Sequence, residues 1–355
     1  MATLKGYRND EVHPTLSRAR PQSQLRLGQD ATGRESYGAC AVLESSGAGG
    51  LTDFTFGGTT TGEGWSVNPY SGCMHACTYC YVPDTIKAER RRWGSYSIVK
   101  RDLPTRLLRA MQSSKKITVY ISTATDPYQP LEAEHEVTRR CLEVLVRKDW
   151  PVEVLTRSPL VLRDLDLLTQ LSQVRVGMSV PTLDDELRRA IEPKAPAIPA
   201  RLRTLKKLSN AGIATFANYT PATPPTTHDA DGVANAFLDA GVHWVNSKRF
   251  QRKETALVPL FDRLHDTEWS DIPTFFASEA RQEEWQQQLG AAFRKVGLPL
   301  SKPFFNPPFE HLVPALPEAT QQSKLTEIRM PATAARPTNR VPARPLGLVG
   351  AVRGA

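Results

Sequence analysis

Three cysteines close together in the sequence are the residues best suited to chemistry. Cys73, Cys77 and Cys80 have the spacing C-x3-C-x2-C. Thiolates are soft ligands for the irons of an iron–sulfur cluster, and four of them would fill every iron position of a 4Fe–4S cluster. The two remaining cysteines, Cys40 and Cys141, lie outside this run. The run therefore predicts a 4Fe–4S cluster with one iron open to an exchangeable ligand.

Zinc is the alternative metal, because His75 adds a fourth acceptable donor to the three thiols. His75 is only two residues from Cys73 and from Cys77, which places the imidazole poorly beside either thiol. The sequence also has no second C-x2-C pair to complete a zinc ribbon. A disulfide framework is less favoured, since 5 cysteines in 355 residues are few and odd in number. A non-catalytic, zinc-structured nucleic-acid-binding protein stays open as an alternative.

The run GCMHACTYCY at 72–81 resembles the cluster loop of the radical S-adenosylmethionine (SAM) superfamily, and within it the spore photoproduct lyase branch. In that superfamily the open iron binds the amino acid end of SAM, and reduction cleaves SAM to methionine and a 5'-deoxyadenosyl radical. The resemblance implies a radical SAM enzyme that abstracts a hydrogen atom from a nucleobase, nucleotide or specialised metabolite. It also implies an electron donor such as flavodoxin or ferredoxin.

Short apolar segments alternate with amphipathic ones between Gly64 and Phe250, a pattern typical of βα units around a parallel sheet. We expect strands at Trp65–Pro69, Ile117–Thr123, Pro151–Arg157, Val174–Val180, Ile213–Tyr219 and His243–Lys248. We expect helices at Leu103–Gln112, Glu134–Arg147, Leu160–Leu171, Asp184–Ile191, Ile198–Ala211 and Asp231–Ala240. These units predict an α/β fold, a partial (β/α)6 TIM-type barrel. The resemblance implies the same barrel, with the cluster loop after its first strand.

Composition divides the chain into four parts. We expect an irregular N-terminal arm at 1–62 with one strand at Thr52–Phe56, the barrel at 63–250, a C-terminal extension at 251–312 with one clear helix at Glu279–Val296, and a tail at 313–355. The extension is expected to cover the open side of the barrel. The tail is rich in proline, alanine and arginine, which predicts disorder.

Polar side chains follow the second, third and fourth expected strands. Reactive groups of barrel enzymes gather at the carboxyl ends of the strands, so these positions are candidates for cofactor binding. The resemblance implies that Thr125, Asp126, Arg157 and Ser179 contact SAM. Arg157 has a planar guanidinium suited to the SAM carboxylate.

Three acidic or basic side chains in this region also have structural interpretations. A proline follows Asp126, so this residue could simply initiate a turn. Arg157 could pair with an aspartate of the segment 164–166. Glu192 could reach the ribose of SAM, but a salt bridge with Arg188 is the safer interpretation.

One position departs from the lyase branch, in which a cysteine after the second strand returns a hydrogen atom to the product radical. Aligning Asp126 with the family places Thr123 there, and an alcohol O–H bond is far too strong for that reaction. Cys141 falls on the apolar face of its expected helix and is predicted to lie in the core. A DNA photoproduct-repair lyase is therefore only an alternative. Tyr79 and Tyr81 coincide with tyrosines that relay a hydrogen atom in the lyase, and are the catalytic candidates; the alternative is that they only pack around the adenine of SAM or the cluster.

The net charge is +8, from 45 Lys and Arg against 37 Asp and Glu. This excess is compatible with nucleic acid or another anionic substrate, although part of it lies in the tail after Lys324. The sequence has no apolar run near the roughly 18 to 20 residues that span a bilayer, and its polar start lacks the apolar segment of a signal peptide. We expect a cytoplasmic monomer that acts on a small-molecule or nucleotide substrate.

Overall fold

The computed structural model describes residues 27–29, 35–37, 40–46, 49–56, 59–226, 228–250 and 254–301. Its main sheet is built from strands β4 (Thr52–Phe56), β5 (Thr59–Val67), β8 (Val119–Ile121), β9 (Val152–Thr156), β10 (Val174–Ser179), β11 (Ala214–Tyr219), β12 (Trp244–Ser247) and β13 (Leu300–Ser301). These strands lie in the order β13-β12-β11-β10-β9-β8-β5-β4.

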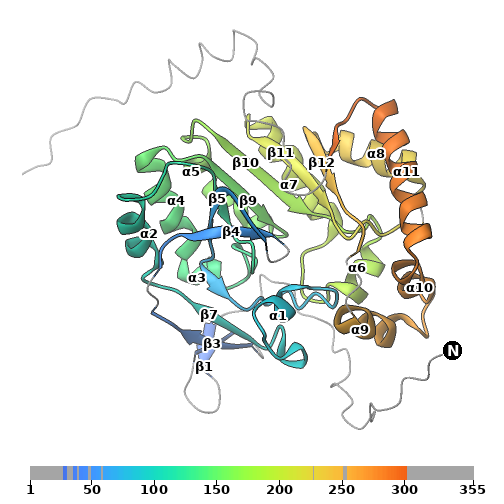
Figure 1. Ribbon diagram of the computed structural model, residues 1–355, viewed down its shortest axis with the longest axis horizontal. Helices are drawn as coiled ribbons and strands as arrows, with labels where there is room; N and C mark the ends of the chain where they lie inside the picture. The colour runs from blue at the N-terminus through green and yellow to red at the C-terminus, as the bar shows by residue number, and fades with distance from the viewer. Residues whose placement is uncertain are drawn as a thin grey trace, which may run out of the picture. The chain divides into compact units, whose positions relative to one another are not determined.

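Within the main sheet, β5, β8, β9, β10, β11, β12 and β13 pair with one another in parallel, and their order in the sheet follows their order in the chain. This is the order of a (β/α) barrel. β4 pairs with β5 in the antiparallel direction, and β13 and β4 are the two edges of the described sheet, so the barrel is incomplete. The predicted α/β class is confirmed (Figure 1), and the six predicted barrel strands are confirmed as β5, β8, β9, β10, β11 and β12.

Helices follow most of the parallel strands, as predicted. They are α2 (Leu103–Met111), α3 (Glu132–His135), α4 (Val137–Lys148), α5 (Leu165–Leu168), α6 (Asp185–Ile191), α7 (Ile198–Asn210), α8 (Ala230–Asp239), α9 (Glu254–Leu264), α10 (Asp271–Ala277) and α11 (Glu279–Lys295). The helix predicted at 134–147 is interrupted at Glu136, which has a left-handed φ of 49°. The helix predicted at 160–171 begins instead as a 3-10 turn, Pro159–Asp164. The prediction missed α9 and α10, which each contain a proline.

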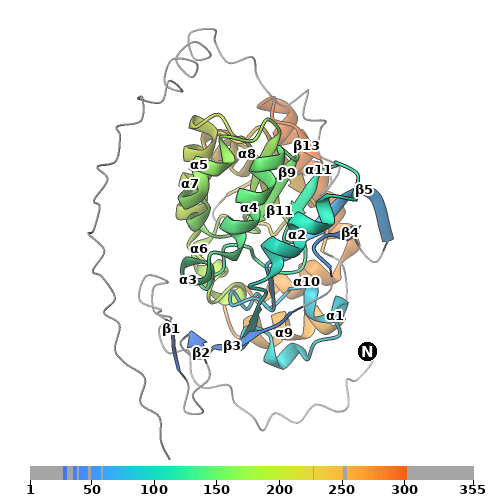
Figure 2. The ribbon, with the colours of Figure 1, turned by 90° about the vertical axis from the view of Figure 1, so that its left-hand side faces the viewer.

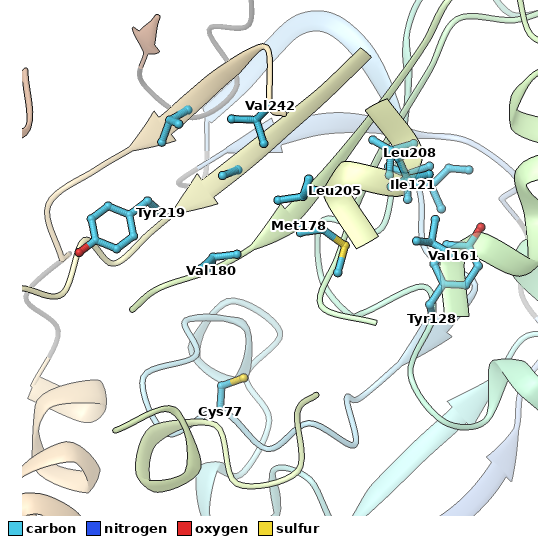
Figure 3. Close-up of a cluster of buried hydrophobic side chains, with 14 of the residues drawn as sticks. Cys77, Ile121, Tyr128, Val161, Met178, Val180, Leu205, Leu208, Tyr219 and Val242 are labelled. Atoms are coloured by element: carbon cyan, nitrogen blue, oxygen red, sulfur yellow. The ribbon is translucent and has the colours of Figure 1, made fainter. Parts of the chain in front are cut away.

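The core lies between the sheet and these helices. In Figure 3, Met178 of β10 lies near Leu205 and Leu208 of α7, and all three side chains are fully buried. On α4, Cys141 and Leu142 are also fully buried, which confirms the predicted apolar face. Burying one such aliphatic side chain stabilises the fold by about 1.5–3 kcal/mol.

A second, smaller sheet contains strands β1 (Leu27–Gln29), β2 (Glu35–Tyr37), β3 (Cys40–Glu44), β6 (Tyr70–Ser71) and β7 (Tyr96–Val99), in the order β1-β2-β3-β7-β6. β3 pairs in parallel with β7, and β6 pairs with the other edge of β7. Figure 2 shows β1, β2 and β3 away from β9 and β11 of the main sheet. The predicted strand at 52–56 is confirmed as β4, but β1, β2 and β3 were not predicted, because the arm is polar and Gly-rich.

The tail predicted to be disordered, 313–355, lies outside the described residues, as does the last part of the predicted extension. The limits of the four predicted parts of the chain stay predictions. Within the described part, no helix has both the length and the apolar character needed to cross a bilayer.

Candidate functional site

The three predicted cluster ligands lie on one tight loop, residues 72–81, here called the cysteine loop. It runs from β6 to the short helix α1 (Val82–Thr85). Gly72 opens the loop with φ +86°, and a Cβ atom there would lie 2.7 Å from the carbonyl oxygen of Tyr96. A Cβ atom on Gly94 would lie 2.3 Å from the Cβ of Ala76. Glycine is therefore required at both positions for the loop to close against the segment that follows it.

The thiols of the cysteine loop are shielded from solvent. Cys73 and Cys77 are buried, and Cys80 is half-buried. Burial raises the pKa of all three thiols, that of Cys73 to about 12, whereas the nearby charge of Arg157 lowers each of them. Metal ligation requires the thiolate form. One guanidinium therefore favours the ligand state of all three cysteines.

The donor set fits an iron–sulfur cluster better than a single ion. Among the residues that the structure describes, no three His, Cys, Asp or Glu side chains converge closely enough to hold one metal ion. A zinc ion needs its ligands within about 2.0–2.3 Å, whereas each thiolate of a cluster binds a different iron. His75 points elsewhere: its Nε2 lies 3.3 Å from Asp126 Oδ2, and its Nδ1 lies 3.4 Å from the carbonyl oxygen of Lys194. The geometry therefore does not support the zinc alternative.

Two side chains from the segment after β8 hold the start of the cysteine loop. The backbone N–H of Met74 donates to Oε1 of Gln129 at 3.1 Å, and Nε2 of Gln129 lies 3.4 Å from the carbonyl oxygen of Gly72. The hydroxyl of Thr125, a predicted SAM contact, donates to the same Gly72 oxygen at 2.6 Å. Gln129 is fully buried, and the sequence analysis did not single it out.

Asp126 joins the cysteine loop to the end of β9. Besides its contact with His75, it accepts hydrogen bonds from the Thr156 hydroxyl at 2.6 Å and from the N–H of Arg157 at 2.8 Å. It also accepts from the N–H of Tyr128, which confirms its role in a turn. Burial opposes ionisation, but His75, Thr156 and Arg157 together lower the pKa of Asp126 to about 2. The carboxylate is thus charged and surrounded by donors.

Arg157 pairs with Glu192, from the end of α6. Its Nε donates to Oε1 of Glu192 at 2.8 Å. The alternative pairing with the 164–166 segment is wrong, because Asp164 and Asp166 bind Arg139 at 2.9 and 2.8 Å. Arg157 is thus held on the side of the sheet where the cysteine loop lies.

The expected salt bridge between Glu192 and Arg188 is also wrong. The Arg188 guanidinium binds Asp185, whereas Oε2 of Glu192 accepts from Nη2 of Arg201 at 2.5 Å. Arg201 also donates to the carbonyl oxygen of Ser179, a predicted SAM contact, at 2.7 Å. Burial opposes ionisation of Glu192, but the charges of the two arginines hold its pKa well below the usual range.

The two tyrosines of the cysteine loop have different environments. Tyr79 is buried, and its hydroxyl donates to Glu192. Burial and the Glu192 charge raise the pKa of Tyr79 well above its ordinary value. Tyr81 is 41% exposed, and its hydroxyl donates to the carbonyl oxygen of Thr123 at 2.7 Å. Of the two phenols, that of Tyr81 is therefore the more accessible to a substrate.

Thr123 lies beside another hydroxyl and not beside a thiol. Its Oγ1 is 2.7 Å from Oγ of Ser66 on β5. The two thiols outside the cysteine loop are buried in other elements, Cys40 in β3 and Cys141 in α4. The prediction that Cys141 lies in the core is confirmed.

Part of the chain resembles known proteins in sequence and in fold. Residues 67–231 match the radical SAM superfamily. An uncharacterized protein of Methanocaldococcus jannaschii is 35% identical over 164 residues, which are 46% of this chain and 62% of that protein. A protein of Pseudomonas phage M6 named radical SAM Nα-GlyT isomerase is 25% identical over 251 residues, which are 63% of this chain and 52% of that protein. The chain thus spans about half to two thirds of the length of these relatives.

A solved structure of a spore photoproduct lyase variant, bound to AdoMet and a dinucleoside spore photoproduct, has the same fold. Its TM-score is 0.53 at 14% identity, and the match covers 71% of this chain and 79% of that one. The matched superfamily uses a 4Fe–4S cluster and SAM, and the three thiols on one loop fit that cluster. Residues 67–231 are therefore a radical SAM domain, the domain of a superfamily whose cofactors are a 4Fe–4S cluster and SAM.

Proposed function

We propose that this chain cleaves SAM reductively at a 4Fe–4S cluster held by Cys73, Cys77 and Cys80. The cofactors would supply a 5'-deoxyadenosyl radical that abstracts a hydrogen atom from an organic substrate. The observation that carries this proposal is that the three thiols lie on one loop, and that Nη2 of Arg157 lies 3.2 Å from the hydroxyl of Tyr79 on the same loop. The Arg157 side chain remains 20% exposed at the carboxyl end of β9.

Arg157 is the residue that we propose to bind the carboxylate of SAM. Its Nε is used by Glu192, and its Nη2 lies 3.2 Å from the Tyr79 hydroxyl. Its Nη1 has no hydrogen-bond partner within the described parts of the chain. A guanidinium nitrogen without another partner can donate charge-assisted hydrogen bonds to a carboxylate.

The other predicted site residues are proposed to act around this contact. Ser179 would line the amino acid part of SAM from the end of β10. Thr125 and Asp126 use their side chains within the protein, so we propose that they shape the backbone that faces SAM. We propose that Tyr81, which is exposed, faces the substrate, and that Tyr79, which is buried, faces the cluster.

We further propose that the reaction takes no hydrogen atom from a protein thiol. Thr123 stands where the lyase branch has a cysteine, and Cys40 and Cys141 are buried in β3 and α4. An isomerisation is redox-neutral and can take the hydrogen atom back from 5'-deoxyadenosine. The relative from Pseudomonas phage M6 is named an isomerase, which supports this class of reaction on a small-molecule or nucleotide substrate. A photoproduct-repair lyase is the less favoured alternative, because it needs the missing donor.

The test is reductive cleavage of SAM by the whole chain. The protein is purified without oxygen, reconstituted with iron and sulfide, and mixed with SAM and dithionite, which replaces a donor such as flavodoxin or ferredoxin. Chromatography then measures 5'-deoxyadenosine. We expect product from the wild type and from Cys141→Ala, which removes a buried thiol from α4, but none from Cys77→Ala. Iron-loaded wild type that forms no 5'-deoxyadenosine would contradict the proposal.

A further inference from the structure

A chain of polar contacts connects four separate segments at the carboxyl ends of the strands. Arg201 of α7 donates from Nη1 to the carbonyl oxygen of Ser179 at 2.7 Å and from Nη2 to Glu192 at 2.5 Å. Glu192 in turn accepts from Nε of Arg157 at 2.8 Å, and Nη2 of Arg157 lies 3.2 Å from the hydroxyl of Tyr79. β10, α7, β9 and the cysteine loop are thus joined through one carboxylate.

Glu192 is rigidly placed within this chain of contacts. Its side chain and that of Arg201 are both fully buried. All three guanidinium nitrogens of Arg201 are hydrogen-bonded, since Nε also donates to the carbonyl oxygen of Pro196 at 2.9 Å. A side chain such as Arg201, whose hydrogen-bonding nitrogens all have partners, can fix the orientation of the carboxylate that it binds.

Glu192 contacts the guanidinium of Arg157 only at Nε. It accepts from Nε, and the Tyr79 hydroxyl lies 3.2 Å from Nη2, so Nη1 has no hydrogen-bond partner among the described residues. Oε1 of Glu192 also lies 3.8 Å from Sγ of Cys77, a cluster ligand. Glu192 therefore contacts both Arg157 and the side chain of a predicted cluster ligand.

We propose that Glu192, anchored by Arg201, is a positioning residue that holds Arg157 in the orientation that binds the carboxylate of SAM. This inference rests on the proposed function, in which Arg157 contacts SAM. It gives Glu192 a role through Arg157 and not a contact with SAM. Without Glu192 the guanidinium would keep its charge but would lose its fixed direction, and a hydrogen bond from Nη1 to a carboxylate depends on that direction.

The test uses a double variant, because Glu192→Ala alone would leave Arg201 buried without its charge partner and could prevent folding. Glu192→Leu/Arg201→Leu removes both charges. The matched control is Glu153→Leu/Arg175→Leu, which removes another buried Glu–Arg pair, joined at 3.0 Å near the start of β9 and β10. Iron content and thermal unfolding check that both variants fold and carry the cluster.

The measurement is the change that SAM produces in the electron paramagnetic resonance spectrum of the reduced cluster, titrated to give a dissociation constant. We expect SAM binding to weaken by about tenfold or more in Glu192→Leu/Arg201→Leu, and to stay close to wild type in the control. Equal SAM affinity in the wild type and Glu192→Leu/Arg201→Leu would overturn the inference, and so would equal weakening in both double variants. Failure of the iron-loaded wild type to bind SAM would instead overturn the proposed function itself.

Discussion

The carboxylate of Asp126 lies 3.3 Å from the imidazole of His75, and both side chains are buried. His75 stands in the middle of the cysteine loop, and Asp126 stands in the turn after β8. The same carboxylate accepts from the backbone N–H of Arg157. A single acidic side chain therefore holds together the loop that carries the cluster ligands and the strand end that carries the proposed SAM contact.

Replacing Asp126 by asparagine should destabilise the protein even without the cluster. Asp126→Asn keeps the shape of the side chain but removes the charge that three hydrogen-bond donors and His75 share. We expect the free energy of unfolding to fall by about 2–4 kcal/mol, which urea denaturation of the cluster-free protein would measure. Asp239→Asn, on the exposed face of α8, is the control and should change it by less than about 0.5 kcal/mol. Equal effects of the two variants would contradict the role of Asp126.

The contribution of Asp126 should depend on pH in a defined window. Its pKa is about 2 in the folded protein and 3.8 as a free side chain. A carboxyl group whose folded pKa is lowered stabilises the fold above its unfolded pKa, and this stabilisation is lost as the pH falls through the folded value. The difference in unfolding free energy between wild type and Asp126→Asn should therefore shrink by roughly 2 kcal/mol between pH 5 and pH 2. Urea denaturation at a series of pH values tests this, and a constant difference would refute it.

Gln129 should matter for cluster assembly. Gln129→Leu keeps the size of the side chain but leaves the N–H of Met74 and the carbonyl oxygen of Gly72 without this partner. We expect the start of the cysteine loop to loosen, at a cost of about 1–3 kcal/mol, and less iron and sulfide to be retained per chain after reconstitution. Gln112→Leu, at an exposed position after α2, is the control. Full iron content in Gln129→Leu would show that the loop does not need this amide.

The two tyrosines of the cysteine loop should differ in their structural contribution. Tyr79→Phe removes the donor to buried Glu192, whereas Tyr81→Phe removes a hydrogen bond at a side chain that is 41% exposed. Chemical denaturation should show that Tyr79→Phe lowers the free energy of unfolding by about 1–3 kcal/mol and that Tyr81→Phe lowers it by less. The reverse order would mean that the buried phenol is not held by Glu192 as described.

The sequence predicted the parts of the fold that depend on local pattern. The six strands β5, β8, β9, β10, β11 and β12 were recognised, because each contains a short apolar segment, whereas β6, β7 and β13 were not predicted. The buried face of α4 was predicted from its helical spacing, and Cys141 lies in the core as expected. The cluster ligands were predicted for the same reason, since their spacing is local. The arm strands β1, β2 and β3 escaped prediction because their partners, not their composition, stabilise them.

The partners of the charged residues could not be predicted, because they depend on how distant segments meet. Arg157 and Glu192 are 35 residues apart in the sequence, and nothing in the pattern favours this pair over Arg157 with Asp164. Arg188 lies one helical turn before Glu192, which made it the plausible local partner. In the structure Arg188 forms a salt bridge with Asp185, and Arg201 of the next helix forms one with Glu192.

The small sheet determines how far the chain can be shortened. β3 covers one edge of β7 while β6, on the other edge, leads directly into Cys73. A fragment starting at residue 63 would leave one edge of β7 unpaired, and an unpaired strand edge promotes aggregation. It would also remove Val42, which is 4% exposed, from the core. The region that matches the superfamily is thus not a detachable module. A shortened chain that keeps β7 paired must include β3, residues 40–44, which precede every residue assigned to the site.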